Sequence, residues 1–297
     1  MCIRDSILPG RIDQGGTTIR DVTDMIPPGH RSEAERIATD LDVEIANHTA
    51  EGNALGTDAE AQCQVIVEEG VPVFVGALGS PGFIADRFKE VGTTVISIVG
   101  STKQAVAVVK DGAEVVIAQG TEGGGHTGHV GTMALLPQVL DAVDVPVVAA
   151  GGIGDGRGMA AALLMGCQAV WVGTRFLATD EAGIQGWQKA GIVDAADQSP
   201  VISRAYTGKR FRMLPNDWTR AWEASELDPL PMPLQPVLAG EVLGAMAGDR
   251  GSHPGVSMNG AGNIAGLIDA VVPAAQVVDS MATEAAVLLS GAATLLR

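Results

Sequence analysis

The sequence is poor in aromatic residues and in positive charge, and both shortages narrow the class of protein. Only 3% of the 297 residues are aromatic, whereas 46% are hydrophobic, so the core must be built from small aliphatic side chains. The 19 lysines and arginines stand against 35 acidic residues, which gives a formal net charge of −16. Nucleic acids and anionic membranes both require a basic surface. We therefore expect neither as a partner.

Cysteine and long apolar runs are also scarce. The three cysteines, Cys2, Cys63 and Cys167, are an odd number without the spacing of a metal site, which disfavours both a disulfide scaffold and a zinc centre. No apolar run approaches the roughly 18 residues of a membrane-spanning helix. These absences predict a cytoplasmic protein without a structural metal.

From residue 71 onward the sequence repeats one pattern, in which a short β-branched run is followed by a helix and then by glycine. Strands are predicted at 71–78, 93–99, 114–118, 145–150 and 169–172. Helices with capping signals are predicted at 80–91, 101–112, 132–143 and 155–165. Alternating apolar strands and helices imply a parallel sheet that is covered by helices.

The position of the glycines favours a TIM (β/α)8-type barrel over an open, doubly wound sheet. An open sheet would carry a phosphate-binding fingerprint after its first strand, and none is present. The glycines cluster after the last strands instead, where barrels keep their phosphate site. We therefore predict an α/β fold of the barrel type.

The repeating pattern stops after Phe176. Residues 177–253 are expected to form a cap over the strand ends, and residues 254–297 are expected to form helices that pack on the barrel exterior. Helices in these two segments are predicted at 182–190, 217–225, 261–272 and 273–289.

One histidine lies among glycines directly after a predicted strand. The loop Gln119–Gly128 reads Gln-Gly-Thr-Glu-Gly-Gly-Gly-His-Thr-Gly, so His126 should lie at the carboxyl end of a parallel strand, where α/β folds carry their chemistry. An imidazole titrates near neutral pH and can act as a base or as a positive charge facing an anion. We predict that His126 is catalytic. The histidines without this setting are His30, His48 and His253, and the competing candidate is His129.

Two glycine-containing turns on adjacent predicted strands offer a site for an anion. The first, Ala149–Gly156, contains Gly151 and Gly152 and leads into a helix, so that its backbone N–H groups can face a phosphate. The second, Gly173-Thr174, combines close backbone approach with a hydroxyl donor. Together they predict a phosphate cradle at the barrel mouth. Since no dehydrogenase fingerprint is present, the cradle points to flavin mononucleotide (FMN).

Taken together, these motifs resemble the nitronate monooxygenase family of FMN-dependent barrels. The resemblance covers roughly residues 71–212 and is carried by Gln119–Gly128, Thr132–Val139, Ala149–Ile153, Gly173–Phe176 and Ser203–Lys209. It implies an enzyme that oxidises an alkyl nitronate, such as propionate 3-nitronate, with O₂ to a carbonyl compound and nitrite. It also implies that His126 acts as the base or as an electrostatic partner. The residues that it implies for FMN contact are Gln119, Gly151, Gly152, Gly173 and Thr174.

The N-terminal region departs from that family. The Ala-Pro-Met strand motif is absent, and residues 1–6 resemble translated sequencing-adapter sequence. Ser6–Gly10 resembles the end of a third strand, and a helical excursion over 10–70 follows, with helices starting near Ser32 and Thr57. We therefore expect residues 7–176 to form a partial FMN-binding barrel without its first two βα units, which amount to about 60 residues.

Other functions stay open beside nitronate oxidation. A flavin-dependent enoyl-thioester reductase of the type II bacterial class shares the glycine and histidine loop but would consume NAD(P)H. A non-catalytic flavin-binding fragment is the second alternative. An IMP-dehydrogenase-like barrel is disfavoured, because neither Cys63 nor Cys167 lies in a predicted mouth loop. A homo-oligomer is compatible with each of these functions.

Overall fold

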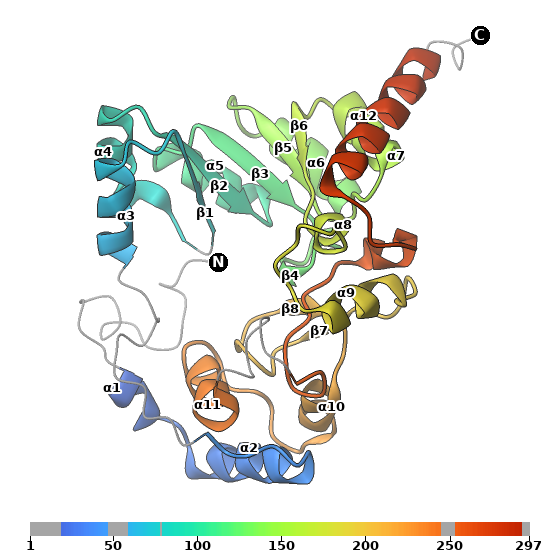
Figure 1. Ribbon diagram of the computed structural model, residues 1–297. Helices are drawn as coiled ribbons and strands as arrows, with labels where there is room; N and C mark the ends of the chain where they lie inside the picture. The colour runs from blue at the N-terminus through green and yellow to red at the C-terminus, as the bar shows by residue number, and fades with distance from the viewer. Residues whose placement is uncertain (1–18, 47–58, 78, 245–252, 293–297) are drawn as a thin grey trace.

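The computed structural model describes residues 19–46, 59–77, 79–244 and 253–292 (Figure 1). The predictions made for residues 1–10, for His48 and for a helix start at Thr57 lie outside the described residues. No helix in the described ranges is long and apolar enough to cross a membrane.

Five parallel strands form one sheet in chain order, which confirms the predicted α/β fold (Figure 1). Each strand pairs with the next, so that Ile98 lies opposite Ile117, and Ile117 lies opposite Val148. An order without a crossover is that of a barrel segment, because a doubly wound sheet reverses its order. Within the described ranges the first and the last strand of this sheet each pair with one other strand, so the sheet is open at both edges. The strands are β1 (Val73–Gly76), β2 (Thr94–Val99), β3 (Val115–Gln119), β5 (Val147–Ala150) and β6 (Ala169–Trp171).

Helices alternate with these strands, as the pattern predicts. They are α3 (Ala59–Glu68), α4 (Ala85–Glu90), α5 (Thr102–Lys110), α6 (Thr132–Leu140) and α7 (Gly156–Leu164). Ser101 caps α5 by accepting the N–H of Gln104 at 3.3 Å, and Asp155 caps α7. The helix predicted at 80–91 is broken, because Ile84 leaves helical geometry between the 3₁₀ turn η2 (Pro81–Phe83) and α4. The buried Ile84 side chain packs with that of Phe88.

The core between the sheet and its helices contains the small aliphatic side chains expected from the scarcity of aromatics. It includes Val99, Val116, Ala118, Leu136 and Val139. Cys167 lies in the same cluster, and Cys63 of α3 is buried in a separate cluster with Phe88 of α4. Among the residues that the structure describes, neither cysteine forms a disulfide.

A second core lies apart from the sheet and joins two distant parts of the chain. Figure 1 places its helices at the bottom of the view; they are α1 (Ile19–Thr23), α2 (Pro28–Asp40), α10 (Asp217–Ala224) and α11 (Leu234–Leu243). They bury a cluster that includes Ile37, Trp218, Trp222 and Leu238. The N-terminal excursion therefore packs on the cap segment, an arrangement that the sequence pattern did not indicate.

An antiparallel ribbon connects the two halves and was not predicted. It consists of β4 (Gly125–His126), β7 (Val201–Ser203) and β8 (Phe211–Met213) in the order β4-β8-β7. His126 pairs with Phe211, and Gly125 pairs with Arg212. The glycine and histidine loop is therefore held by the cap segment.

The C-terminal region differs in part from its prediction. The helix predicted at 261–272 is wrong, because only the 3₁₀ turn η4 (Asn263–Leu267) forms there. A Cβ at Gly262 would lie 2.6 Å from the carbonyl oxygen of Glu122, and one at Gly266 would lie 2.6 Å from the backbone nitrogen of Asp197. At these two glycines the chain lies directly against the backbone of other segments, so it packs there as an extended segment and a short turn and not as a helix. The remaining helices are α8 (Thr174–Leu177), α9 (Gly186–Val193) and α12 (Ala274–Gly291).

Helix α12 packs against α7 on the outside of the sheet (Figure 1). Its buried face carries Val277, Met281 and Ala285, whereas Val278 and Leu288 are exposed.

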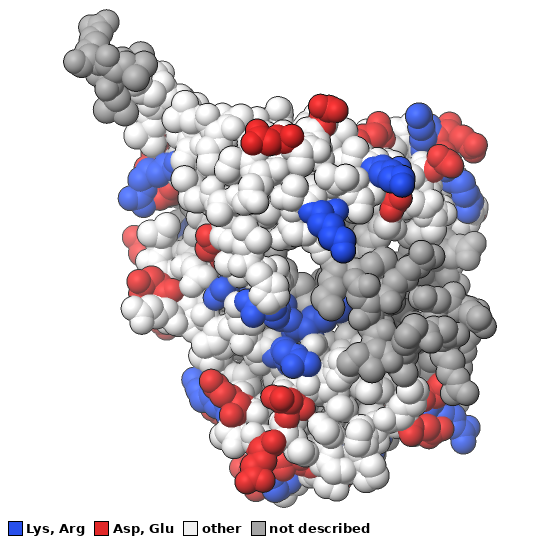
Figure 2. Space-filling view, turned by 180° about the vertical axis from the view of Figure 1, so that it is seen from behind, with Lys and Arg blue, Asp and Glu red and all other residues white. Residues whose placement is uncertain are grey.

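The charges are unevenly distributed over the surface. Figure 2 shows a group of Lys and Arg side chains around a hollow in the middle of the back face. Most Asp and Glu side chains in that view lie nearer its margins. The hollow is therefore locally basic although the whole chain is acidic.

Candidate active site

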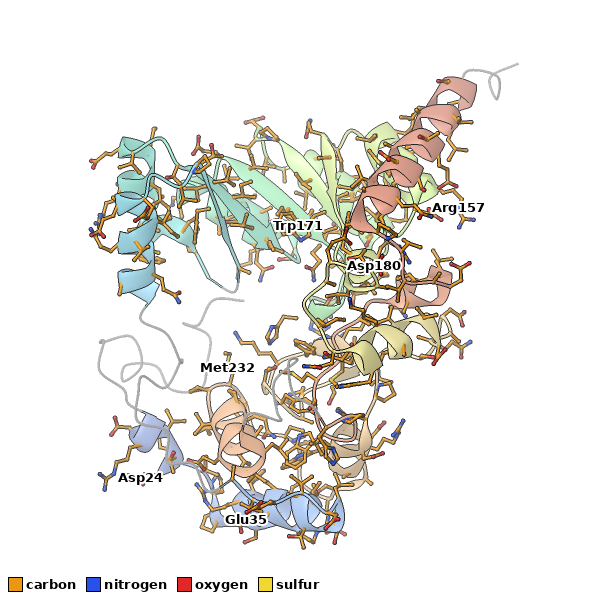
Figure 3. The ribbon with its side chains drawn as sticks, viewed as in Figure 1. Asp24, Glu35, Arg157, Trp171, Asp180 and Met232 are labelled. Atoms are coloured by element: carbon orange, nitrogen blue, oxygen red, sulfur yellow. The ribbon has the colours of Figure 1, made fainter. Side chains whose placement is uncertain are left out.

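A cavity of about 300 Å³ lies at the carboxyl ends of β3, β5 and β6. This volume is at the lower end of the range for small-molecule sites. The predicted cofactor residues Gln119, Gly151, Gly152, Gly173 and Thr174 all line it. Trp171, labelled in Figure 3 at the end of β6, is a further wall residue and has 46% of its surface exposed. His126 itself is not a wall residue.

The first glycine turn brings two strand ends into close contact. Gly151 and Gly152 have φ values of +85° and +73°, which L side chains rarely adopt. A Cβ at Gly151 would lie 2.7 Å from the carbonyl oxygen of Gly120. The backbone conformation therefore requires glycine at both positions. Because neither residue has a side chain, main-chain groups form the wall of the cavity here.

The second turn is shaped differently. A Cβ at Gly173 would meet no atom within 4 Å, so the fold does not require glycine there. The absence of a side chain at Gly173 instead leaves room in the cavity. The neighbouring Thr174 accepts the N–H of Gly262 on its Oγ1 at 2.9 Å, which ties the C-terminal segment to this wall.

The amino end of α7 does not contribute to the anion site, contrary to the prediction for the turn at Ala149–Gly156. Asp155 accepts the N–H groups of Arg157 and Gly158 at 3.0 and 3.2 Å. Glu284 of α12 accepts the N–H of Gly156 at 2.7 Å. Carboxylates therefore already occupy the N–H groups with which the amino end of α7 would bind an anion.

His126 lies one aromatic ring away from the cavity. Its ring is edge-on to that of the wall residue Phe211, with centroids 5.1 Å apart and an interplanar angle of 89°. The Nε2 atom lies 3.1 Å from Oγ1 of Thr207, and the backbone carbonyl accepts from Nε2 of Gln119 at 2.8 Å. His129, the competing candidate, is exposed.

The surroundings of His126 favour its neutral form. Burial lowers the pKa of the imidazole below its ordinary value of 6.5, and the positive charge of Lys209 lowers it further. The side chain is therefore uncharged at neutral pH and able to accept a proton.

Glu122 is a wall residue that the sequence analysis did not single out. Its carboxylate accepts the backbone N–H of Thr132 at 2.9 and 3.0 Å. Oγ1 of Thr132 lies 2.9 Å from this carboxylate and 2.7 Å from the carbonyl oxygen of Gly151. Thr132 was predicted to cap α6, but it is the first helical residue, and Gly131 holds the cap position. Glu122 thus caps the helix from within the glycine loop and links this loop to the next βα unit.

Two further wall residues, Gln188 and Asn259, come from the segment that follows the sheet. Nε2 of Gln188 donates to the carbonyl oxygen of Met258 at 2.8 Å, and Nδ2 of Asn259 donates to that of Gln188 at 3.1 Å. Their local sequence carries no motif, and they meet only through tertiary contacts across 71 residues of chain. Sequence patterns could not have identified them.

The fold and the cavity at the carboxyl ends of the strands are those of a barrel-type α/β enzyme. The family model described as "Nitronate monooxygenase" matches residues 18–284, and the chain belongs to this family of flavin-dependent oxidoreductases.

The curated relatives differ in what their names describe. A Mycobacterium tuberculosis protein described as a monooxygenase is 32% identical over 94% of this chain and 79% of its own length. A Rhodococcus jostii protein, (3aS,4S,5R,7aS)-5-hydroxy-7a-methyl-1-oxo-octahydro-1H-indene-4-carboxyl-CoA dehydrogenase, is 43% identical over 57% of this chain. The match spans only 48% of that relative, so the chain covers about half of it.

Solved structures show the same architecture. The nitroalkane oxidase of Streptomyces ansochromogenes superimposes with a TM-score of 0.75 and 30% identity, over 93% of this chain and 78% of that one. FabK of Thermotoga maritima superimposes with a TM-score of 0.71 and 30% identity, over 89% and 84%. Both similarities extend over the sheet and the cap.

Proposed function

We propose that this protein is an FMN-dependent enzyme that oxidises alkyl nitronates, such as propionate 3-nitronate, with O₂ to a carbonyl compound and nitrite. The observation that carries the proposal is the glycine-walled cavity at the strand ends, with His126 next to its wall residue Phe211. Membership of the nitronate monooxygenase family and similarity to the nitroalkane oxidase support it. The location that we propose is a reducing cytoplasm, with which buried cysteines outside disulfides, Cys63 and Cys167, are compatible.

The cavity walls fit a flavin phosphate. Gly151 and Gly152 would hold it with backbone groups, while Gly173 leaves room for close approach and Thr174 offers a hydroxyl. Gln119, which ends β3, would contact the flavin itself. When bound, the flavin supplies the electron transfer. The protein residues bind and orient the substrate and move its proton.

The substrate expected at this site is small and anionic. A nitronate carries a negative charge, and the basic group around the hollow of the back face attracts anions (Figure 2). Lys209 adds a positive charge next to His126. A nitroalkane is the neutral, protonated precursor of the nitronate, and a neutral His126 can deprotonate it.

The proposal is tested by adding FMN to the purified chain, removing the excess and recording the visible absorption spectrum. We expect a retained flavin with a protein-shifted spectrum, and then O₂ uptake and nitrite release with nitronates in the absence of NAD(P)H. Flavin retention without nitronate turnover would contradict the proposed reaction. Loss of the flavin would contradict the proposed cofactor.

The cofactor position predicts a specific effect at Gly173. Gly173→Ala adds a methyl group that the fold accommodates but that enters the cavity. We expect the free energy of unfolding to change by less than about 1 kcal/mol, while FMN affinity falls roughly tenfold or more, since bound phosphate would lose close backbone contact. Fluorescence titration with FMN measures the affinity.

The matched control is Gly183→Ala, which also adds a methyl group where no atom lies within 4 Å but which does not line the cavity. Both substitutions should leave the melting temperature nearly unchanged. Equal FMN affinity in the two variants would remove Gly173 from the cofactor site.

A second candidate function is flavin-dependent chemistry on an acyl thioester. The relative with 43% identity is a carboxyl-CoA dehydrogenase, and the enoyl-thioester reductase predicted as the alternative would use NAD(P)H. Oxidation of NAD(P)H that depends on an enoyl thioester, together with no turnover of nitronates, would favour this function. Retention of FMN with neither activity would favour a non-catalytic flavin-binding fragment.

A further inference from the structure

Thr207 connects the catalytic candidate to the cap segment through three polar contacts on one oxygen atom. Its hydroxyl donates to the carbonyl oxygen of Lys209 at 3.3 Å, and its Oγ1 accepts the N–H of Lys209 at 3.3 Å. The third partner is Nε2 of His126 at 3.1 Å. These contacts engage the complete hydrogen-bonding capacity of a hydroxyl group, which has one hydrogen and two acceptor sites.

The three contacts together favour one assignment of donors and acceptors. A hydroxyl has a single hydrogen, so when Thr207 donates to the Lys209 carbonyl, its contact with His126 uses a lone pair of Oγ1. In this arrangement Nε2 of His126 is the donor and carries a hydrogen. A neutral imidazole has one N–H, so its other nitrogen, Nδ1, holds the free lone pair.

Nδ1 of His126 is available for chemistry. It forms no hydrogen bond within the described ranges, and it is not among the buried polar atoms that lack a partner there. Nδ1 therefore keeps some surface that is accessible to solvent. The Nε2 side, in contrast, is turned towards the cap.

The position of Thr207 is set by a rigid loop. The next residue, Gly208, has φ +69°, and a Cβ there would lie 2.5 Å from the backbone nitrogen of Met232. The N–H of Gly208 donates to the carbonyl oxygen of Arg204 at 2.9 Å, and Nε of Arg204 donates back to the Gly208 carbonyl at 3.1 Å. The loop therefore presents the Thr207 hydroxyl at one place beside His126.

We infer that Thr207 is a positioning residue that holds the neutral His126 ring with its hydrogen on Nε2, so that Nδ1 is the atom that accepts the proton of a nitroalkane. In this step the C–H bond next to the nitro group breaks, its electron pair stays on the substrate as the nitronate, and the proton forms the new N–H bond at Nδ1. The inference rests on the proposed function. A preformed nitronate has already lost this proton and does not need the base.

The first test measures the tautomer directly. Nitrogen-15 NMR of the flavin-loaded chain, labelled at histidine, should show a neutral ring protonated on Nε2 near pH 8, with the signal assigned by its loss in His126→Gln. In Thr207→Val, which removes the hydroxyl but keeps the shape, we expect a mixture of both tautomers. A wild-type ring protonated on Nδ1 would overturn the inference.

The second test compares a substrate that needs the base with one that does not. For Thr207→Val we expect kcat/KM to fall about tenfold or more with nitroethane, but less than about twofold with ethyl nitronate, for which no proton is transferred. Thr207→Ser keeps the hydroxyl and should stay within about threefold of wild type on both substrates.

The outcomes separate the inference from the proposed function. An equal loss on both substrates in Thr207→Val would indicate a merely structural role for Thr207 and would overturn the inference. If the wild-type chain converts neither substrate, the proposed function fails, and the NMR measurement on wild type still decides the tautomer. Because that measurement needs no variant at Thr207, a poorly folded Thr207→Val leaves the inference testable.

Discussion

Replacing His126 with alanine is expected to lower kcat/KM for nitroalkanes by about 100-fold or more, since a positioned general base contributes 10²–10⁴-fold. FMN should remain bound, because the proposed phosphate contacts lie on the two glycine turns and His126 is not a cavity wall. The activity of the wild-type chain should rise with pH as His126 loses its proton. The midpoint of this rise should lie below 6.5, the pKa of an ordinary histidine. The direction follows from the lowered pKa of His126, because the neutral ring is the active form. Initial rates with nitroethane between pH 5 and 8 measure both effects.

The matched control for this substitution is His129→Ala. His129 lies three residues further along the same loop but is exposed, so its removal should leave the rate and the pH profile unchanged. Nitroalkane turnover that survives in His126→Ala, with flavin retained, would remove this residue from the mechanism.

Gly151→Ala is expected to lower the free energy of unfolding by roughly 3 kcal/mol and to abolish FMN retention. A left-handed backbone costs a side-chain-bearing residue of order 1–3 kcal/mol, and Gly151 has φ +85°. The new Cβ would also lie 2.7 Å from the oxygen and 3.0 Å from the nitrogen of Gly120. Since both are backbone atoms of the next strand end, neither can rotate away. Urea unfolding measures the stability, and the visible spectrum measures the retained flavin.

The effect of Gly151→Ala is compared with that of Gly183→Ala, at a site where φ is not positive and no atom lies within 4 Å of the added Cβ. The control should change stability by less than about 1 kcal/mol. If both variants unfold at the same urea concentration, the turn tolerates movement and the assigned close contact with Gly120 is wrong.

The sheet was predictable because its strands are continuous apolar runs, and the central strands β3 and β5 are largely buried. The residues Val115–Gln119 and Val147–Ala150 carry this signal without help from tertiary structure. The ribbon strands Gly125–His126, Val201–Ser203 and Phe211–Met213 were missed because two or three residues are too few to show a period.

The candidate site was predictable where glycine and histidine stand out, and not where ordinary residues acquire a role through packing. Gly151, Gly152 and Gly173 are recognisable beside apolar runs, and the structure places them in one cavity. Glu122 could not be distinguished from a surface acid, although its carboxylate caps α6. The hydroxyl of Thr207 lies 81 residues from His126 in sequence, and no local pattern joins the two.

The second core has a consequence for how the chain is made. Helix α2 buries Ala34, Ile37 and Ala38 against side chains that include Trp218 and Trp222. During synthesis α2 leaves the ribosome well before these partners exist, and contacts of such long sequence separation form slowly. The apolar stripe of α2 is thus uncovered while the whole sheet is being translated. We expect the nascent chain to need a chaperone on this segment, and refolding of the finished chain to be limited by the closure of the second core.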